Sequence, residues 1–418
     1  MSLLNLQSAF GICVILALAW ALSERKRDFP WRVVAAGVAV QIVLAAVFLN
    51  VPIVRDGLPA LNVGVEAIHV APKAGTSFVV GYIGGADAPF TVTNPGAMGN
   101  FAFQILPSLM VIGALSALAW HWRILPAIVA FMSWALRRTL GIGGAVGVSC
   151  GANVFLGTIE SPLLIKPYLE RLTRSELFIV FTCGMANAAG TILVFYSIIL
   201  KPVVGAAALG HIIIASLLSL PASIMIAMVM IPGKETTPAD AGVGHSYNGT
   251  MDAVARGTTD GLAMFLQIIA MLVVVIALVA LANYMLAGLG DVWGAPLTFE
   301  RMAGWIFAPI AWCIGIPWEE AIDAGRLLGL KFILNEVVAY LQQAALPADT
   351  LSARTDLMML YALCGFANFS SVGITIAGVT VLAPNRRKEI VQLAQRSLIS
   401  GTLSSLMVGA TVGLMPLG

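Results

Sequence analysis

The sequence predicts an all-α membrane protein that crosses the bilayer many times, and three observations support this fold class. Hydrophobic residues make up 59% of the 418 residues and charged residues only 11%, far from the shares usual in soluble domains. The mean hydropathy is +0.93. Apolar stretches of about 20 residues, the length that a spanning helix needs, recur along the chain. Most of the chain is therefore expected to lie in lipid.

Eight stretches are candidates for spanning helices, and their composition predicts that some are broken. Six are uniformly apolar: residues 3–22, 33–51, 101–120, 206–231, 262–286 and 395–415. Two less uniform spans lie near residues 176–200 and 355–382. The chain has 41 glycines and 20 prolines, which membrane helices tolerate where neighbours or cavities satisfy the freed backbone groups. The prediction is about eight spans with interrupted helices.

The distribution of basic residues predicts the orientation in a bacterial inner membrane. The first apolar stretch is followed, not preceded, by basic residues, which is the reverse of a cleavable signal peptide. If that first basic cluster is cytoplasmic, every later basic turn also falls on the cytoplasmic side, as the positive-inside rule requires. Both termini are then periplasmic. The basic residues concerned are Arg25, Lys26, Arg27, Arg32, Arg137, Arg138, Lys166, Arg171, Arg174, Lys234, Arg256, Arg386, Arg387 and Lys388.

Two further segments are too polar to span and read as re-entrant hairpins that line a cavity. Residues 144–170 contain several glycines, Glu160 and Pro162, and residues 317–346 contain Lys331 and Glu336. Such segments occur at membrane depth only where protein or water surrounds them. Residues 54–70 and 122–138, with prolines and mixed polarity, are expected to lie in the membrane interface.

An internal repeat follows from two similar heptapeptides. Residues 183–189 read CGMANAA and residues 364–370 read CGFANFS, with four of seven positions identical. Each heptapeptide lies in an apolar stretch and follows one hairpin, and the predicted topology inverts one unit relative to the other. Inverted repeats with matching helix breaks indicate a substrate site near the bilayer midplane. Chance similarity of small-residue helices is the alternative.

Glu160 and Glu336 are the strongest candidates for function because a carboxylate within the bilayer is costly. The alternative is a structural pairing with Lys166 or Lys331. Two carboxylates, the asparagines of the repeat and the pair Ser370 and Ser371 suit a neutral solute rich in hydroxyl groups, since carboxylates accept hydrogen bonds and amides both donate and accept. This chemistry admits a sugar, a nucleoside or a polar amino acid.

Six short motifs together resemble signatures of the concentrative nucleoside transporter family, in the same order from about residue 75 to 400. They are GTSF (75–78), FAFQILP (101–107), ANVFLG (152–157), ESPL (160–163), LNEVVAY (334–340) and CGFANFSS (364–371). The resemblance implies a homotrimer in which a transport domain moves like an elevator past a scaffold formed largely by the third and sixth spans. It implies no enzymatic activity and no cofactor besides a coupling ion.

The resemblance also implies a division of the substrate site between the repeats. The first hairpin and fourth span are expected to hold the nucleobase through Thr158, Ile159, Glu160 and Ile192. The second hairpin and seventh span are expected to hold the ribose. The residues on that side are Glu336, Asn368 and Ser371, with Phe366 as an apolar wall.

The sodium site that the resemblance implies is altered in this chain. Asn153 and the carbonyl groups of Leu156 and Ala188 match it, but Ile159 and Asn187 stand where hydroxyl-bearing side chains belong. A hard cation needs a nearly complete shell of oxygens. The sequence therefore favours a proton as the coupling ion, with Glu160 as its carrier because burial favours the protonated form of a carboxylate. A sodium site rebuilt with Asn187 and water is the alternative.

The hairpin also departs from the family in a way that concerns the base. Residues 157–160 read GTIE, where the family usually has Gln at the second position and Thr or Ser at the third. An amide that would read the edge of the base is lost. The substrate is expected to be a nucleoside such as uridine or adenosine, with a nucleobase or a modified nucleoside as alternatives.

The expected organisation has five parts. Residues 1–100 form N-terminal spans and an interfacial helix, 101–138 a scaffold helix and an interfacial helix, 139–231 the first repeat, 232–299 a cytoplasmic loop and a scaffold helix, and 300–418 the second repeat and last helix.

An intramembrane enzyme is disfavoured, because His69, His121, His211 and His245 are isolated from catalytic patterns. The cysteines, all single, are expected to pack in apolar helices, and nothing favours nucleic acid as a partner.

Overall fold

The computed structural model describes residues 3–51, 61–93, 98–233, 235–237, 247–288, 290–292, 294–347 and 349–416. The regular secondary structure of these residues is almost entirely helical, in agreement with the predicted fold class. The exception is a small antiparallel hairpin of β1 (Asp291–Val292) and β2 (Ala295–Pro296), which follows the longest helix.

Four helices of the described chain are long and apolar enough to cross a membrane. They are α1 (Leu3–Ala21), α2 (Trp31–Asn50), α5 (Ser108–His121) with the π-helical turn Phe101–Ile105 before it, and α12 (Ala208–Met230). The predicted span 262–286 lies inside the longer helix α13 (Thr250–Ala287), and the predicted span 395–415 overlaps α19 (Arg387–Gly413) up to its last residue. The first turns of both helices are polar.

The two less uniform spans are broken where the repeat predicted. The first consists of α10 (Arg174–Ala186) and α11 (Gly190–Val204), and the second of α17 (Ala353–Leu363) and α18 (Phe369–Leu382). A hairpin precedes each broken helix. The first hairpin contains α7 (Gly144–Ala152), α8 (Glu160–Leu164) and α9 (Lys166–Leu169), and the second contains α15 (Trp318–Ile333) and α16 (Glu336–Ala345).

Three more helices lie outside these units. The predicted interfacial segment 122–138 is α6 (Ile124–Leu140), which exposes Phe131 and Trp134 and carries two arginines in its last turn. The predicted segment 54–70 falls partly outside the described residues, and its remainder begins α4 (Leu61–Val80). The sequence analysis missed α14 (Phe299–Cys313), because Glu300, Arg301 and Pro309 interrupt its apolar pattern.

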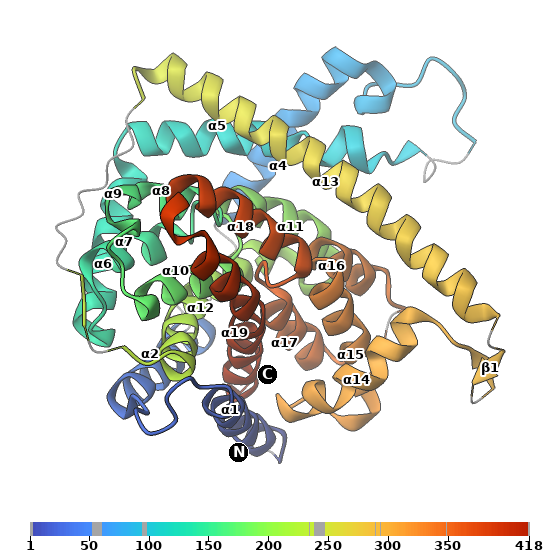
Figure 1. The fold of residues 1–418 in the computed structure, drawn as a ribbon. Helices are drawn as coiled ribbons and strands as arrows, with labels where there is room; N and C mark the ends of the chain where they lie inside the picture. The colour runs from blue at the N-terminus through green and yellow to red at the C-terminus, as the bar shows by residue number, and fades with distance from the viewer. Residues whose placement is uncertain are drawn as a thin grey trace.

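The helices form a bundle that α5 and α13 cross on one side (Figure 1). Glycines allow α5 and α13 to approach closely, since a Cβ on Gly257 or Gly261 would meet the backbone of Gly113 or Leu109. Close approach of this kind at small residues is the usual way in which membrane helices pack. The two ends of the chain lie together at the opposite side of the bundle, where Asn5 Nδ2 donates to the carbonyl of Leu414 at 2.8 Å.

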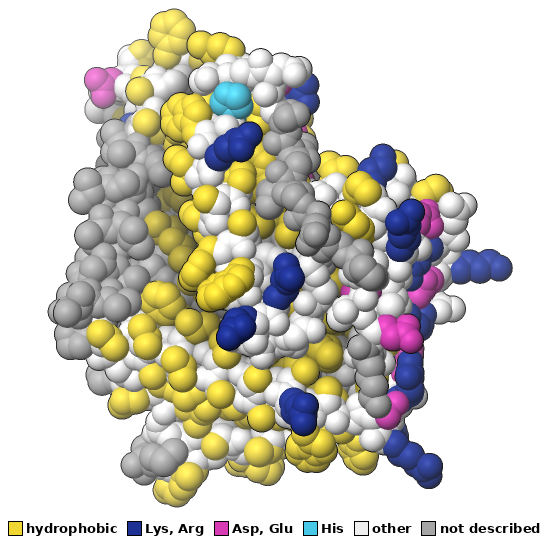
Figure 2. Space-filling model, turned by 90° about the vertical axis from the view of Figure 1, so that its left-hand side faces the viewer, with side chains coloured by type: hydrophobic (Ala, Val, Ile, Leu, Met, Phe, Trp, Pro, Cys, Tyr) yellow, Lys and Arg dark blue, Asp and Glu magenta, His cyan; other side chains and the backbone are white. Residues whose placement is uncertain are grey.

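The core runs through α10, α12, α17 and α19, which are buried along most of their length. The hydroxyl groups of α19 donate to carbonyls of its own preceding turn, as Ser404 does to Ser400 over 2.7 Å. The serine and threonine residues of α19 therefore pack in the core with their hydroxyl hydrogens bonded. The outer surface is rich in apolar side chains, while acidic ones gather along one edge of the face shown in Figure 2. Such a surface suits lipid rather than water.

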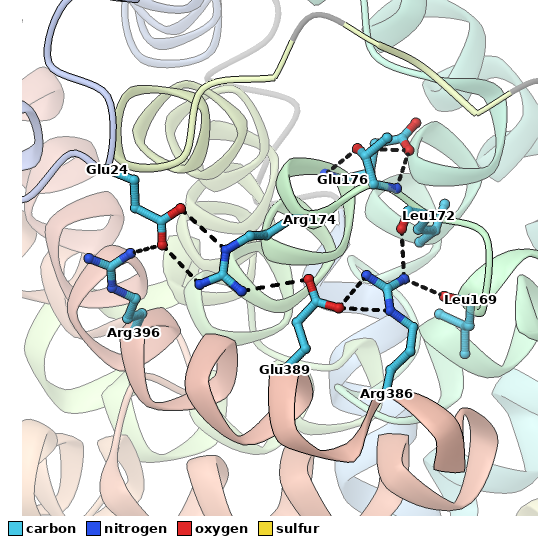
Figure 3. Close-up of polar contacts among 9 residues, drawn as sticks. Glu24, Leu169, Leu172, Arg174, Glu176, Arg386, Glu389 and Arg396 are labelled. Atoms are coloured by element: carbon cyan, nitrogen blue, oxygen red, sulfur yellow. Dashed lines mark hydrogen bonds and ion pairs between the residues drawn. The ribbon is translucent and has the colours of Figure 1, made fainter.

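A network of ion pairs fastens the polar ends of three segments (Figure 3). Glu24, in the loop after α1, accepts hydrogen bonds from Arg174 at the start of α10 and from Arg396 of α19. Arg174 also lies 3.6 Å from Glu389, which pairs with Arg386 at 2.7 Å. The network connects segments that are far apart in the sequence. Two of its arginines, Arg174 and Arg386, belong to the basic turns for which the sequence predicts a cytoplasmic position.

Candidate functional site

A cavity of about 710 Å³ lies where the tips of the two hairpins meet the two helix breaks. All eight substrate-binding residues expected from the sequence line this cavity: Thr158, Ile159, Glu160, Ile192, Glu336, Phe366, Asn368 and Ser371. A wall from α5 and α13 closes it on another side. Its volume is in the range of pockets that enclose a small organic ligand.

Glu336 is held at the floor of the cavity by donors from two other helices. Its side chain is 3% exposed. Oε1 accepts a hydrogen bond of 2.6 Å from the hydroxyl of Tyr196 in α11, and Oε2 accepts one of 3.2 Å from Nδ2 of Asn368. An ionised carboxylate has about four acceptor sites, so acceptor capacity remains for a ligand that donates from the cavity.

Asn368 has a structural task besides its contact with Glu336. It is the N-cap residue of α18, and its Oδ1 accepts the backbone N–H of Ser371 at 2.9 Å. The cap satisfies one of the free donors at a helix start and turns Nδ2 toward Glu336. Asn335 caps α16 in the same way, through the backbone N–H of Val338. The side chains of Asn368 and Asn335 are therefore held in place by the helix caps that they form.

The first hairpin presents a carboxylate in a different setting. Glu160 is the first residue of α8, and its side chain is exposed to the cavity rather than buried in protein. The carboxylate lies against Gly157, where a Cβ would collide with it. The hairpin tip therefore needs glycine at residue 157 to let Glu160 fold back.

The side chains beside Glu160 pack against both repeats. Thr158 lies against Gly184 of α10, at the distance of an ordinary contact. Ile159 packs against Gly378 of α18, so the close approach depends on the missing side chain there. Ile192, at the start of α11, is buried at 4% exposure.

The two helix breaks contact one another directly. The backbone N–H of Phe366 donates to the carbonyl of Asn187 at 3.3 Å. Gly365 has a φ of +136°, and a Cβ there would collide with the carbonyl of Ala186. This position requires glycine both for its backbone conformation and for the close approach. The repeat-related heptapeptides therefore meet at the centre of the molecule.

The residues expected at the altered cation site lie between the first hairpin and α10. Asn153 is 1% exposed and donates from Nδ2 to Ser161 Oγ at 2.8 Å. Asn187 is fully buried and donates from Nδ2 to the carbonyl of Cys183 at 3.1 Å, whereas its Oδ1 has no hydrogen-bond partner. Leu156 lines the cavity, and Ala188 is buried behind it. A buried amide oxygen without a donor is an available ligand for a cation or a water molecule.

Sequence reasoning missed two features of the site. Tyr196, which orients Glu336, lies on α11 with no motif to mark it. The wall from α13 includes Arg256, Asp260 and Met264, none of which the sequence motifs mark, and α13 begins at Thr250, well before the predicted span. The spacing of four residues among these three wall residues, which places them on one helix face, was the available signal.

Three family models match successive parts of the chain. The model described as "Na+ dependent nucleoside transporter N-terminus" matches residues 10–83, the model "Nucleoside recognition" matches residues 102–203, and the model "Na+ dependent nucleoside transporter C-terminus" matches residues 211–413. The third match includes the second hairpin, α17 and α18.

Characterised and uncharacterised transporters are similar over nearly the whole chain. Nucleoside permease NupC of Helicobacter pylori is 33% identical over 98% of this chain and 97% of its own length. The uncharacterized transporter YutK of Bacillus subtilis is 32% identical over 97% of this chain and 98% of its own. Sodium/nucleoside cotransporter 1 of Rattus norvegicus is 30% identical over 98% of this chain but 64% of its own length.

Solved structures agree with the fold. The transporter CNTnw in an inward-facing substrate-bound state superposes with a TM-score of 0.90 at 32% identity, covering 99% of this chain and 98% of that one. A variant of CNTnw in an outward-facing state has a TM-score of 0.91 at 32% identity, covering 98% and 97%. These relatives are elevator-type transporters and not enzymes. Because a relative is 33% identical over 98% of this chain, the chain belongs to the concentrative nucleoside transporter family.

Proposed function

We propose that this protein imports nucleosides across the bacterial inner membrane by symport with a cation, and that the cation is a proton. The observation that carries the proposal is the cavity in which Glu336 and Asn368, joined by a hydrogen bond of 3.2 Å, share space with the cavity-exposed Glu160. Glu336 and Asn368 supply a recognition site for hydroxyl groups. Glu160 supplies a carboxylate that a proton can reach.

Recognition of the ribose rests on the second hairpin and α18. A nucleoside bound here donates its ribose hydroxyl hydrogens to the free acceptor sites of Glu336. Asn368 Nδ2 has a second hydrogen to donate to a ribose oxygen, since an amide nitrogen carries two. Ser371, at 7% exposure, adds a hydroxyl group at the cavity wall.

The base is held by the first hairpin and by apolar walls. Thr158 and Glu160 offer polar groups for the edge of the base, while Ile159, Ile192 and Phe366 provide apolar surface for its faces. Pockets for small ligands combine such apolar walls with a few polar groups that fix orientation.

A proton suits the coupling role because the cation site lacks the hydroxyl groups that the family resemblance implies. Ile159 packs against Gly378 and offers no ligand. Glu160 is open to the cavity, so a proton can bind before the nucleoside is carried inward and leave after release. Its neutralisation lowers the cost of moving the loaded site through the membrane.

Sodium coupling is the second candidate, favoured by one specific observation. The amide oxygen of Asn187 is buried and without a hydrogen-bond donor. Together with Asn153 and the carbonyls of Leu156 and Ala188, it supplies oxygen ligands of the kind that hard cations prefer. A water molecule would then take the place of the missing hydroxyl groups.

The proposed orientation rests on the distribution of basic residues, and the proposed homotrimer rests on the family resemblance. The cavity extends to Trp120, Tyr247 and Arg256, near the ends of α5 and α13 that the charge distribution assigns to the cytoplasm. An inward-open cavity with both termini periplasmic is consistent with this arrangement. We further propose a homotrimer surrounded by lipid, in which the elevator domain of each subunit moves past its own α5 and α13.

The test is uptake of labelled uridine or adenosine into liposomes under imposed gradients. An inward proton gradient without sodium should drive accumulation, and an inward sodium gradient at fixed pH should not. Strict dependence on sodium would replace the proton by the second candidate.

A competition panel tests the substrate class. An intact nucleoside should compete well, whereas free ribose, a free nucleobase and a 2′,3′-dideoxynucleoside should compete poorly, because each leaves buried polar groups unpaired. Equal competition by the nucleobase would redirect the proposal to a nucleobase transporter.

A further inference from the structure

Lys331 is a buried basic residue that is not among the proposed substrate contacts. It lies in α15, is 2% exposed and does not line the cavity. Its Nζ donates to the carbonyl of Ala362 at 2.9 Å, in the last turn of α17. Tyr340 of α16 donates to the carbonyl of Leu360 in the same helix at 2.8 Å. An ammonium group removed from water is costly unless another charge compensates it.

The acidic side chain that offers compensation is Glu336, which is also buried and lies five residues further along the chain. The chain turns back at Leu334 and Asn335, which brings the end of α15 and the start of α16 together. Both side chains lie within this buried region, at 2% and 3% exposure, without a direct ion pair between them, so any compensation acts through the protein interior, where charges are weakly screened. The other titratable groups around Glu336 are Tyr196, Tyr340 and Cys364, which are neutral at physiological pH in their ordinary state.

The first repeat has no such cation. The residue five places before Glu160 is Phe155, and residues 139–165 contain neither lysine nor arginine. Lys166 is exposed. Asp260 and Arg256 of α13 line the same cavity as Glu160, and Arg256 pairs with Asp252 at 2.9 Å. The two repeat-related glutamates therefore differ, because a buried lysine lies five residues before Glu336 and no lysine or arginine holds the corresponding place before Glu160.

We propose that Lys331 is a built-in counter-ion that keeps Glu336 ionised as the ribose acceptor, so that the need for a mobile cation falls on Glu160 alone. The part that concerns Glu160 rests on the proposed function, whereas the pairing of Lys331 with Glu336 does not. Lys331 acts through Glu336 and is thus a positioning residue. The bond to Ala362 holds its ammonium group at the helix break, where α17 presents its free carbonyls.

A double-mutant cycle tests the pairing without any transport assay. Thermal unfolding midpoints are measured for the purified protein and its variants Lys331→Met, Glu336→Gln and the double variant. Removing one member of a buried pair leaves an uncompensated charge, so Lys331→Met should lower the midpoint strongly. Adding Glu336→Gln should then restore more than half of that loss. Additive losses would mean that Lys331 serves only to cap α17, and would overturn the proposal.

The pH dependence of the same cycle provides a second readout. The loss caused by Lys331→Met should be smaller at pH 5.5 than at pH 7.5, since protonation removes the uncompensated charge of Glu336. This difference should disappear in the double variant, which has no carboxylate there. A loss that is equal at both pH values would contradict the pairing. Lys331→Arg, which keeps the charge, should recover at least part of the stability that Lys331→Met loses.

Lys166→Met is the matched control, because this lysine flanks the first hairpin but is exposed. Combined with Glu336→Gln, it should give strictly additive and small effects at both pH values. If the wild-type protein fails to transport nucleosides, the proposed function falls, but the cycle still decides the pairing of Lys331 with Glu336.

Discussion

The hydroxyl of Tyr196 donates to Glu336 Oε1 at 2.6 Å and thereby links the first repeat to the ribose side of the cavity. Tyr196 follows the first helix break, on α11, whereas Glu336 begins α16 in the second repeat. Both side chains are buried. The bond means that the first repeat helps to set the position of an acceptor that belongs to the second.

Tyr196→Phe should weaken nucleoside binding while leaving the fold intact. The substitution keeps the ring, which packs against Tyr340 at a centroid distance of 5.0 Å, and deletes a hydrogen bond to a charged group. Such a bond contributes about 1.5 to 3 kcal/mol, or roughly tenfold or more in affinity. Competition assays with uridine measure the change. Tyr284→Phe, at a side chain that is 81% exposed, is the control and should have no effect.

Glu336→Gln and Asn368→Ser should each abolish most nucleoside uptake without unfolding the protein. Serine is chosen at residue 368 because it retains the N-cap acceptor of α18 and loses only the amide donor. Each variant deletes a hydrogen bond worth about 1 to 3 kcal/mol in a buried site. Uptake and thermal unfolding should be measured together. The control is Glu319→Gln at the exposed start of α15, and normal uptake by either site variant would remove the ribose assignment.

Asp260→Asn should change the preference among bases. Glu160 and Asp260 both line the cavity, and carboxylates accept hydrogen bonds from exocyclic amino groups. Adenosine and cytidine carry such groups where inosine and uridine carry a carbonyl oxygen. The wild-type protein should therefore favour the amino-bearing member of each pair. The variant should reduce that ratio by roughly three- to tenfold, measured as competition at equal concentrations.

Asp252→Asn is the matched control for this change of preference. Asp252 lies on the same helix but pairs with Arg256 at 2.9 Å and is outside the cavity lining. It should leave the preference among bases unchanged. If Asp260→Asn lowers uptake of all four nucleosides equally, Asp260 has no part in reading the base.

The sequence was sufficient to predict the two hairpins, the two helix breaks and the two intramembrane glutamates. Glu160, Glu336 and the heptapeptides marked both hairpins and both breaks, because intramembrane carboxylates and helix interruptions are rare without a purpose. The role of Tyr196 was not predictable, since an apolar helix gives no reason to single out one tyrosine. Lys331 was weighed as a possible partner of Glu336, but its bond to Ala362 depends on how α15 packs on α17. The helix α14 was missed because its apolar positions are interrupted by charge.

The ion pairs around Glu24 should stabilise the protein at neutral pH and fail in acid. A hydrogen bond from Arg174 holds the pKa of Glu24 below its ordinary value of 4.5. A group with a lowered pKa contributes stability above its unfolded value, and that stability is lost as the pH falls through the folded value. Glu24→Gln should therefore lower the unfolding midpoint slightly at pH 7 and not at pH 3. Glu24 and its arginine partners lie at the surface and are partly exposed, so solvent screens the charges and each pair contributes about 1 kcal/mol at most.

Asp28→Asn provides the comparison for this network. Asp28 lies in the same loop and is 3.8 Å from Arg25, with both side chains well exposed. Its removal should change the midpoint less than Glu24→Gln does at pH 7. An equal effect at both pH values for Glu24→Gln would mean that its charge has no part in stability.

Placing hydroxyl groups at the altered cation site should make uptake respond to sodium. The double variant Ile159→Ser with Asn187→Ser adds oxygens at the two positions that lack them, next to Asn153 and the carbonyl of Leu156. A cation bound between the first hairpin and α10 would then have a fuller shell of oxygen ligands in place of its water. Uptake of uridine into liposomes should become responsive to an inward sodium gradient, whereas the wild-type protein should respond to the proton gradient. The double variant Ile159→Val with Asn187→Ala changes the same positions without adding oxygens and should remain unresponsive to sodium. If wild-type uptake already depends strictly on sodium, the free amide oxygen of Asn187 is the ligand to examine, and Asn187→Ala alone should then abolish sodium stimulation.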